Sequence, residues 1–261
     1  MLIGWTYVRG QGWNTMMNLE PMPKVAVLDG DILAYRIAFW AESEGIEDIE
    51  TRVDHDVKAW VPPGITTVHI AVSCARSDNF RRKIWDPYKR HRDVNRKVPE
   101  ALPLAVELVT KVGNKLDIPQ LEADDVMGIM ASGYRAVAVT IDKDLRSVRG
   151  WHWNPDKEDK PVLVDARQAE YNFHKQWLTG DTTDNIPGIW KCGPIKAQKL
   201  LDSVQPHNWT DAVLGAYEQA KDAQGNPYSL DYCVKMAQCV RILRDGEYNS
   251  DTKEPILWNP A

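Results

Sequence analysis

Lys24 to Asp31 reads KVAVLDGD, and this short stretch indicates the class of the fold. Its first five residues form a continuous Val-rich run, which is typical of a strand buried on both faces of a parallel sheet. The chain then turns at Gly30, and Ile32 to Trp40 is predicted to be a helix. Asp29 would therefore lie at the carboxyl end of a strand, where open α/β sheets place their sites. Asp31 has a simpler alternative role as the N-cap of the helix.

Further segments repeat this strand-and-helix pattern. Val68 to Val72 and Ala136 to Ile141 are predicted to be buried strands, and Pro99 to Leu116 is predicted to be an amphipathic helix between them. Val148 to Val164 has the alternation and the turn-like centre of a hairpin. The sequence therefore predicts an α/β fold with a mostly parallel sheet flanked by helices. A helical C-terminal region follows, clearest from Ser229 to Leu243.

Acidic residues gather where the predicted elements begin and end. The stretch Leu121 to Val126 reads LEADDV and opens a helix with three acids, of which the first and third share a face at i and i+3. Two more acids follow a strand in Asp142-Lys143-Asp144, and another pair lies in the loop from Gly180 to Gly188. Each group has a plain alternative, because acids satisfy free N–H groups at helix starts and Asp commonly forms turns.

Taken together, these segments supply eight carboxylates without a neighbouring His. Such a set favours hard divalent cations with oxygen ligands, Mg²⁺ or Mn²⁺, over zinc. Two such ions a few ångströms apart would activate a water and stabilise the leaving oxygen of a phosphodiester. The predicted metal ligands are Asp29, Glu122, Asp124, Asp125, Asp142, Asp144, Asp181 and Asp184.

The charge distribution points to a local path for nucleic acid. The formal net charge of the 261 residues is −5, which argues against a protein that merely coats nucleic acid. Between Arg81 and Lys97, however, eight Lys/Arg face two acids, a local charge of +6, with Trp85, Tyr88 and His91 interleaved. Cations mixed with aromatics suit phosphates and unstacked bases. A solvated charged face is the alternative.

The segment from Gly188 to Leu201 offers a second place for phosphates. A Gly/Pro turn leads into a helix that starts after Pro194, where free N–H groups and the helix dipole favour an anion. Lys191, Lys196 and Lys199 add positive charge. Ordinary solvated lysines on a surface helix are the alternative.

The remaining composition places the chain among intracellular proteins. The four cysteines have no C-x-x-C spacing, so we expect free thiols in a reducing compartment. No run is long and apolar enough to span a bilayer. Residues 1–23 lack the pattern of a signal peptide, and we expect a weakly ordered leader there and a cytoplasmic protein with no membrane partner.

At this point the sequence resembles the 5′-nuclease superfamily. That superfamily contains flap endonucleases, the 5′-nuclease domain of bacterial DNA polymerase I and the stand-alone 5′→3′ exonucleases of bacteriophages. The four acidic motifs occur in the superfamily's order, and the resemblance spans roughly Val25 to Leu201. The motifs are Asp29-Gly30, Leu121 to Asp125, Asp142-Lys143-Asp144-Leu145, and Gly180-Asp181 through Asp184-Asn185-Ile186-Pro187-Gly188.

The resemblance implies an architecture and an activity. It implies a PIN-like catalytic domain over residues 24–175 and a helical region over residues 176–261, where a helix–three-turn–helix grips duplex DNA. The implied activity is that of a 5′→3′ exonuclease or structure-specific 5′ flap nuclease with two Mg²⁺ or Mn²⁺ ions. Its substrate would be DNA with a 5′ end or flap, with RNA/DNA hybrids as a further candidate. The enzyme would act as a monomer in bacteriophage replication, in the host cytoplasm.

The resemblance also implies roles for individual residues. Lys89 and Arg92 would contact the scissile phosphate as catalytic residues, and Tyr35, next to Arg36, would stack on the terminal base. The predicted DNA-binding residues are Tyr35, Arg36, Arg81, Gly188, Lys191, Gly193, Lys196 and Lys199.

Two departures and two rival functions accompany this prediction. Cys74 stands where relatives often carry another acid, and Asp78 is the nearest substitute. Lys191 stands where relatives often have the first of two hairpin glycines. The turn should therefore be shaped differently, because a non-glycine residue tolerates positive φ poorly.

Two rival functions remain. One is a PIN-type ribonuclease, which would not need to grip duplex DNA, and the other is a catalytically impaired relative that only binds DNA.

Overall fold

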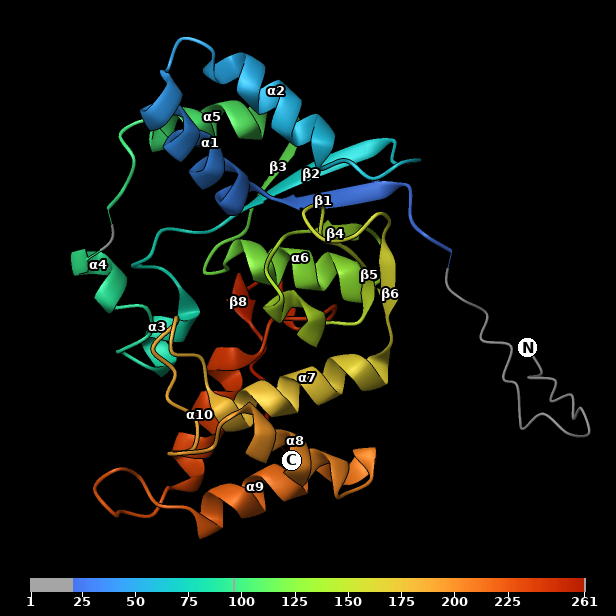
Figure 1. Ribbon diagram of the computed structural model, residues 1–261. Coiled ribbons are helices and arrows are strands. Elements are labelled where there is room, and N and C mark those ends of the chain that lie inside the picture. Colours follow the sequence, from blue (N-terminus) through green and yellow to red (C-terminus); the bar gives the residue numbers. More distant parts are fainter. Residues whose placement is uncertain (1–20, 96, 261) are drawn as a thin grey trace, which may run out of the picture.

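The computed structural model describes residues 21–95 and 97–260 (Figure 1). Of the predicted leader, residues 1–20 lie outside the described part. None of the helices within the described ranges has the length and apolar character that crossing a membrane requires.

A six-stranded sheet forms the centre of the N-terminal part, in the order β3-β2-β1-β4-β5-β6. The first five strands in this order are parallel, and only β6 pairs antiparallel, with β5. This confirms the predicted α/β class, the mostly parallel sheet and the hairpin. The strands are β1 (Val25–Asp29), β2 (Thr67–Val72), β3 (Asn114–Asp117), β4 (Val137–Val139), β5 (Gly150–Trp153) and β6 (Val162–Val164).

Helices cover both faces of the sheet, which explains the continuous apolar runs of its central strands. Ala26 and Leu28 of β1 pack against α1 (Gly30–Glu44), α2 (Ile49–Ala59) and α5 (Leu102–Lys111). Val27 of the same strand points to the other face, where it packs with α6 (Ala123–Ser132). Alternate residues of one strand therefore enter two separate cores.

The predicted helix from Pro99 to Leu116 is wrong over residues 112–116. The helix α5 ends at Lys111, and β3 then pairs in parallel with β2. Gly113 lies between them, packed so closely that a Cβ would stand 2.8 Å from the carbonyl oxygen of Val68. Edge-strand pairing thus replaces the last helical turn that the apolar spacing had indicated.

Two short helices carry much of the basic stretch, α3 (Phe80–Ile84) and α4 (His91–Asn95). They lie beside the cleft between the sheet and the C-terminal helices (Figure 1). A 3₁₀ turn, η1 (Asp144–Ser147), follows β4.

The C-terminal part is helical and has a core of its own. Its elements are α7 (Ala166–Thr179), α8 (Pro194–Asp202), η2 (Pro206–Asn208), α9 (Trp209–Gln219) and α10 (Leu230–Val240). Phe173 and Trp177 of α7 are buried in this core, and the predicted domain boundary between residues 175 and 176 falls inside this helix. The same helix also contacts the N-terminal part, because Asn172 donates to the carbonyl oxygen of Arg146 in η1.

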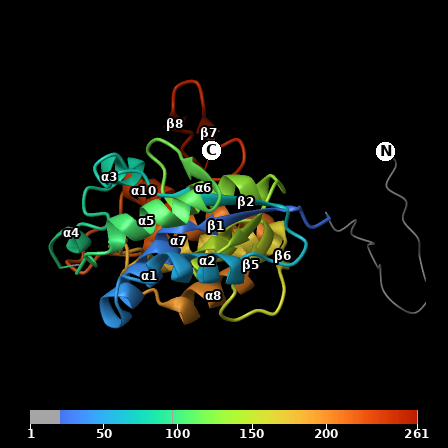
Figure 2. The same ribbon diagram turned by 90° about the horizontal axis from the view of Figure 1, so that it is seen from above.

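The chain returns to the sheet after α10. Ile242 and Leu243 pack with α6 in the core below the sheet, and this contact ties the two parts of the molecule together. The small hairpin of β7 (Tyr248–Asn249) and β8 (Glu254–Pro255) projects from one side of the molecule (Figure 2).

Candidate active site

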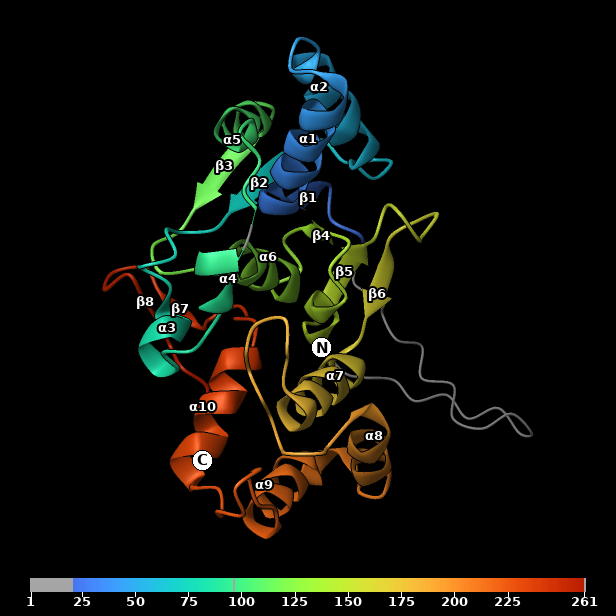
Figure 3. The ribbon, with the colours of Figure 1, turned by 60° about the vertical axis from the view of Figure 1, so that its left-hand side comes forward.

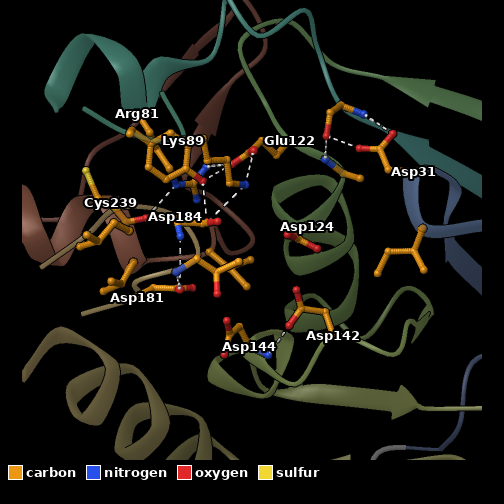
Figure 4. A pocket seen from close by; sticks show the side chains of 18 of the residues that line it. Asp31, Arg81, Lys89, Glu122, Asp124, Asp142, Asp144, Asp181, Asp184 and Cys239 are labelled. Atoms are coloured by element: carbon orange, nitrogen blue, oxygen red, sulfur yellow. Dashed lines mark hydrogen bonds and ion pairs between the residues drawn. The ribbon is translucent and has the colours of Figure 1, made fainter. Parts of the chain in front are cut away.

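The predicted acids meet at the carboxyl ends of the parallel strands. A cavity of about 1280 Å³ opens there, and seven of the eight predicted carboxylates line it. Figure 4 shows Asp124, Asp142 and Asp144 on one side and Asp181 and Asp184 on the other. The seven come from four separate segments of the chain: Asp29, Glu122, Asp124, Asp142, Asp144, Asp181 and Asp184.

Asp29 is fixed where β1 becomes α1. Its Oδ1 accepts a hydrogen bond from the backbone N of Ile32 at 3.0 Å, and its Oδ2 accepts one from Thr140 Oγ1 at 2.8 Å. Asp29 is thus the N-cap of α1, and the alternative that gave this role to Asp31 is wrong. Gly30 allows the tight approach, because a Cβ there would lie 2.6 Å from a carbonyl oxygen of β2. Burial, together with the charge of Asp31, raises the pKa of Asp29 to about 7.

The first turn of α6 presents Asp124 to the same space. Burial, then repulsion from Asp29 and Asp142, raises the pKa of Asp124 well above its usual range. Three carboxylates in such an environment resist ionising together unless a positive charge lies among them.

Asp142 and Asp144 are held by the turn that follows β4. The backbone N of Asp142 donates to Thr140 Oγ1 at 3.1 Å, and the backbone N of Asp144 donates to Asp142 Oδ1 at 2.8 Å. The chain curls into η1 here and is not extended, yet both carboxylates line the cavity. Burial, followed by Asp142 and Asp181, raises the pKa of Asp144 to about 7.

The loop between α7 and α8 positions Asp181 and Asp184. Asp181 and Ile186 exchange two backbone hydrogen bonds of 2.7 Å, which close the loop. Gly180 and Gly188 flank it with φ of 66° and 61°, and a Cβ on Gly188 would lie 2.4 Å from the backbone N of Gly180. Glycine is therefore required at both positions.

Lys89 and Arg92, predicted to contact the phosphate, stand against the carboxylates. Lys89 Nζ lies 2.6 Å from Glu122 Oε1 and 3.3 Å from Asp184 Oδ2, and Arg92 Nη2 lies 2.7 Å from Asp184 Oδ1. Burial disfavours a charge on Glu122, but the charges of Lys89 and Arg81 together with the hydrogen bonds to Glu122 outweigh this effect, and the pKa of Glu122 falls to about 2. Tyr88, to which the sequence assigned no individual site role, donates its hydroxyl to Glu122 at 2.6 Å.

Arg81 and Asp125, a predicted DNA contact and a predicted metal ligand, form a buried ion pair. The Arg81 guanidinium donates to both Asp125 oxygens at 2.7 Å, and the residues are 3% and 0% exposed. Asp125 also accepts from the backbone N of Leu243, and Arg81 donates to the carbonyl oxygens of Cys239 and Arg241. The fold therefore already occupies the polar atoms of both residues, and Arg81 lines the cavity whereas Asp125 does not.

The other predicted DNA contacts divide between two places. Tyr35 and Arg36 line the cavity, and Arg36 is paired with Asp156 at 2.9 Å. Lys191, Lys196 and Lys199 are exposed around the start of α8, and they are absent from the cavity lining.

The turn before α8 keeps the backbone that glycine would adopt. Lys191 has φ of 58°, so this non-glycine residue takes a positive value itself. Gly193 is the N-cap of α8 with φ of −80°, a value open to any residue.

Asp31 and Ser73 add polar groups that the sequence prediction left out of the site. Ser73 Oγ donates to Asp31 Oδ2 at 2.5 Å and accepts from the backbone N of Ala123 at 3.0 Å, which links α1, β2 and α6. Asp31 lines the cavity, whereas Asp78 is exposed and does not, so Asp78 is no substitute for an acid at Cys74. The second acid of Asp29-Gly30-Asp31, two residues after a predicted site residue, was the sequence feature that could have indicated Asp31.

The donor set fits hard divalent cations. The seven predicted carboxylates that line the cavity, and Asp31 beside them, all offer oxygen. The raised pKa values of Asp29, Asp124 and Asp144 indicate that their space lacks compensating positive charge. In the part of the chain that the structure describes, no three His, Cys, Asp or Glu side chains already converge in a ligating geometry.

Comparison with known proteins adds the family. Residues 24–154, half of the chain, match the family model described as "5′-3′ exonuclease, N-terminal resolvase-like domain". The chain belongs to this family. The predicted superfamily is thereby confirmed.

Individual relatives agree in sequence and in fold. The exodeoxyribonuclease of Enterobacteria phage T3 is 26% identical, over 90% of this chain and 93% of its own length. A thermostable DNA polymerase I of Thermus thermophilus is 29% identical over 77% of this chain, but the chain spans only 28% of that relative's length. A zinc-bound structure of T5 5′-exonuclease covers 83% of this chain with a TM-score of 0.62 at 15% identity, which supports the fold.

Proposed function

We propose that this chain is a metal-dependent nuclease that hydrolyses DNA from a 5′ end or at a 5′ flap. The observation that carries the proposal is the single cavity in which carboxylates from four segments face Lys89 and Arg92. The relatives named as exodeoxyribonuclease, exonuclease and DNA polymerase I support it, two of them from bacteriophages. A role in bacteriophage replication, as a monomer in the host cytoplasm, is part of the same proposal.

In this proposal the carboxylates hold divalent cations, two Mg²⁺ or Mn²⁺ ions. The ligands would be Asp29, Asp124, Asp142 and Asp144, with Glu122, Asp181 and Asp184 completing the set. When bound, such ions lower the pKa of the attacking water and stabilise charge on the leaving oxygen.

The chain's own cations would hold the scissile phosphate. A phosphate entering beside Lys89 and Arg92 would replace Glu122 and Asp184 as their ionic partner. Lys89 has a raised pKa, because Glu122 and Asp184 outweigh the opposing effect of burial, and so it stays charged at neutral pH. A fixed positive charge at this place stabilises the negative charge that develops during phosphoryl transfer.

The duplex would be held away from the cut by the turn that leads into α8. Its helix start offers free N–H groups, and Lys191, Lys196 and Lys199 surround it. These groups contact phosphates and no base edges in the proposal, so binding would be independent of sequence.

A panel of three 5′-labelled substrates tests this function: a duplex, a 5′ flap and an RNA/DNA hybrid, each with Mg²⁺ and with EDTA. We expect Mg²⁺-dependent release of short 5′ products from the duplex and the flap. Cleavage of the hybrid would extend the substrate class. Cleavage of only the RNA strand of the hybrid, while the DNA duplex and the DNA flap stay intact, would contradict the proposal and favour the PIN-type ribonuclease.

A further inference from the structure

The outward face of α1 carries an aromatic pair that the core does not bury. Leu33 and Ile37 on the inward face are 0% exposed, whereas Phe39 is 47% exposed. The ring of Phe39 lies 6.3 Å from that of Tyr35, centroid to centroid. Single exposed apolar residues are ordinary. This pair differs because both rings line the cavity that holds the carboxylates.

The neighbouring helix α5 extends this apolar surface. Leu102 and Val106, one helical turn apart, line the same cavity, and Figure 3 shows α5 beside α1 above α6. We call the surface formed by Tyr35, Phe39, Leu102 and Val106 the apolar end of the cavity. The carboxylates lie beyond it, starting at Asp29 where α1 begins.

Cations line the same cavity as the apolar end. Arg36 follows Tyr35 on α1 and pairs with Asp156, and Arg76 also lines the cavity. A surface that combines aromatic rings with cations matches a nucleotide, whose base stacks and whose phosphate is negative. The occupant that fits this chemistry is a nucleic-acid strand that enters the carboxylate site.

The spacing along α1 favours a strand that is unpaired. Tyr35 and Phe39 are four residues apart, which is about 6 Å along a helix axis. Bases stacked in a duplex repeat at about 3.4 Å per strand. Two bases that each pack on one of these rings cannot also keep duplex stacking with each other. The pair therefore fits successive bases of an extended single strand.

We propose that Phe39, with Leu102 and Val106, is a second base-binding position, next to the one at Tyr35, for the unpaired 5′ strand. The inference rests on the proposed nuclease function and names the part of the substrate that this end of the cavity takes. It makes DNA with two or more unpaired 5′ nucleotides bind more tightly than blunt DNA.

The test places the fluorescent base 2-aminopurine at the first or the second unpaired nucleotide from the duplex junction of a 5′-overhang DNA, in EDTA to prevent cleavage. The full chain is used with Phe39→Ala, with Phe39→Trp to retain a stacking ring, and with Ile256→Ala as a matched control. Ile256 is 51% exposed and is not part of the cavity lining.

The wild type, Phe39→Trp and Ile256→Ala should quench 2-aminopurine at both positions. Phe39→Ala should lose the quenching at one position and keep it at the other. Its preference for overhang over blunt DNA should fall about five-fold or more, since stacking on one aromatic is worth about 1–3 kcal/mol per base. Unchanged quenching and preference in Phe39→Ala would overturn the proposal.

Two failures remain distinguishable. If Phe39→Ala loses quenching while the wild type fails to cleave with Mg²⁺, the binding position stands and the nuclease function falls. If cleavage is normal and Phe39→Ala behaves as the wild type, the nuclease function stands and the binding position falls.

Discussion

Asp124 and Asp125 are adjacent in the chain, and their replacement by Asn should change stability in opposite directions. Asp125 is 0% exposed and neutralises the buried Arg81 through two hydrogen bonds of 2.7 Å. Asp125→Asn leaves that guanidinium with Glu122, at 3.3 Å, as its remaining counter-charge, and breaking a buried pair in this way costs about 3–5 kcal/mol. At this chain length the cost lowers the thermal midpoint by about 6–10 °C.

Asp124→Asn removes a carboxyl group that resists ionisation because of burial and the nearby Asp29 and Asp142. The metal-free protein should therefore become more stable at pH 8, where the wild-type carboxylates are forced to share the space.

Thermal unfolding in EDTA at pH 8, followed by circular dichroism, measures both variants under one condition. We expect a lower midpoint for Asp125→Asn and a higher one for Asp124→Asn than for the wild type. Equal destabilisation by the two substitutions would refute the reasoning, because it would place both acids in the same kind of environment.

Three further predictions concern catalysis, binding and pH. Lys89→Ala should lower the single-turnover rate about 100-fold, since a preorganised cation beside the negative charge that develops in the transition state is worth ~3 kcal/mol. A loss of DNA affinity alone, rescued by excess enzyme, would assign Lys89 to binding and not to the chemical step. Joint replacement of Lys191 and Lys196 by Ala should flatten the slope of log affinity against log salt concentration by about two units, because each phosphate contact contributes about 0.9. An unchanged slope would show that neither lysine contacts a phosphate. Folding raises the pKa of Asp29 and Asp144 to about 7. Between about pH 4 and pH 7 the folded metal-free protein therefore binds more protons than the unfolded chain, and its free energy of unfolding falls as the pH rises through this range. The midpoint of thermal unfolding in EDTA should thus be lower at pH 8 than at pH 6, and Mg²⁺ should restore it. A higher midpoint at pH 8 than at pH 6 in EDTA would contradict the raised pKa values of the two carboxyl groups.

The sequence predicted the position of Asp29 and Asp142 well, because each follows a buried strand. Parallel strands place their carboxyl ends at one edge of a sheet, so acids at those ends must come together whatever the loops do. Asp181 and Asp184 lie far along the chain, and only their acidic loop between Gly180 and Gly188 indicated that they belong to the predicted metal ligands. The loop closed by Gly180 and Gly188 brings them to the cavity.

Long-range contacts limited the rest. The spacing of Glu122 and Asp125 predicted one shared helix face, but Glu122 is the N-cap of α6 and only Asp125 lies within the helix. The spacing also held no information on Arg81, which lies 44 residues before Asp125 and pairs with it. The same limit applies to α5, whose apolar period runs on to Val112. There Gly113 turns the chain into an edge strand, and only the packing against β2 reveals the change.

The most direct test of the proposed activity is the single-turnover release of 5′-labelled product from flap DNA, measured across Mg²⁺ concentration for the wild type and Asp142→Ala. We expect release that rises with Mg²⁺ for the wild type and is almost lost in Asp142→Ala, while both proteins bind the DNA with similar affinity. Mg²⁺-independent release, or full activity in Asp142→Ala, would contradict the assignment of this cavity as a metal-dependent nuclease site.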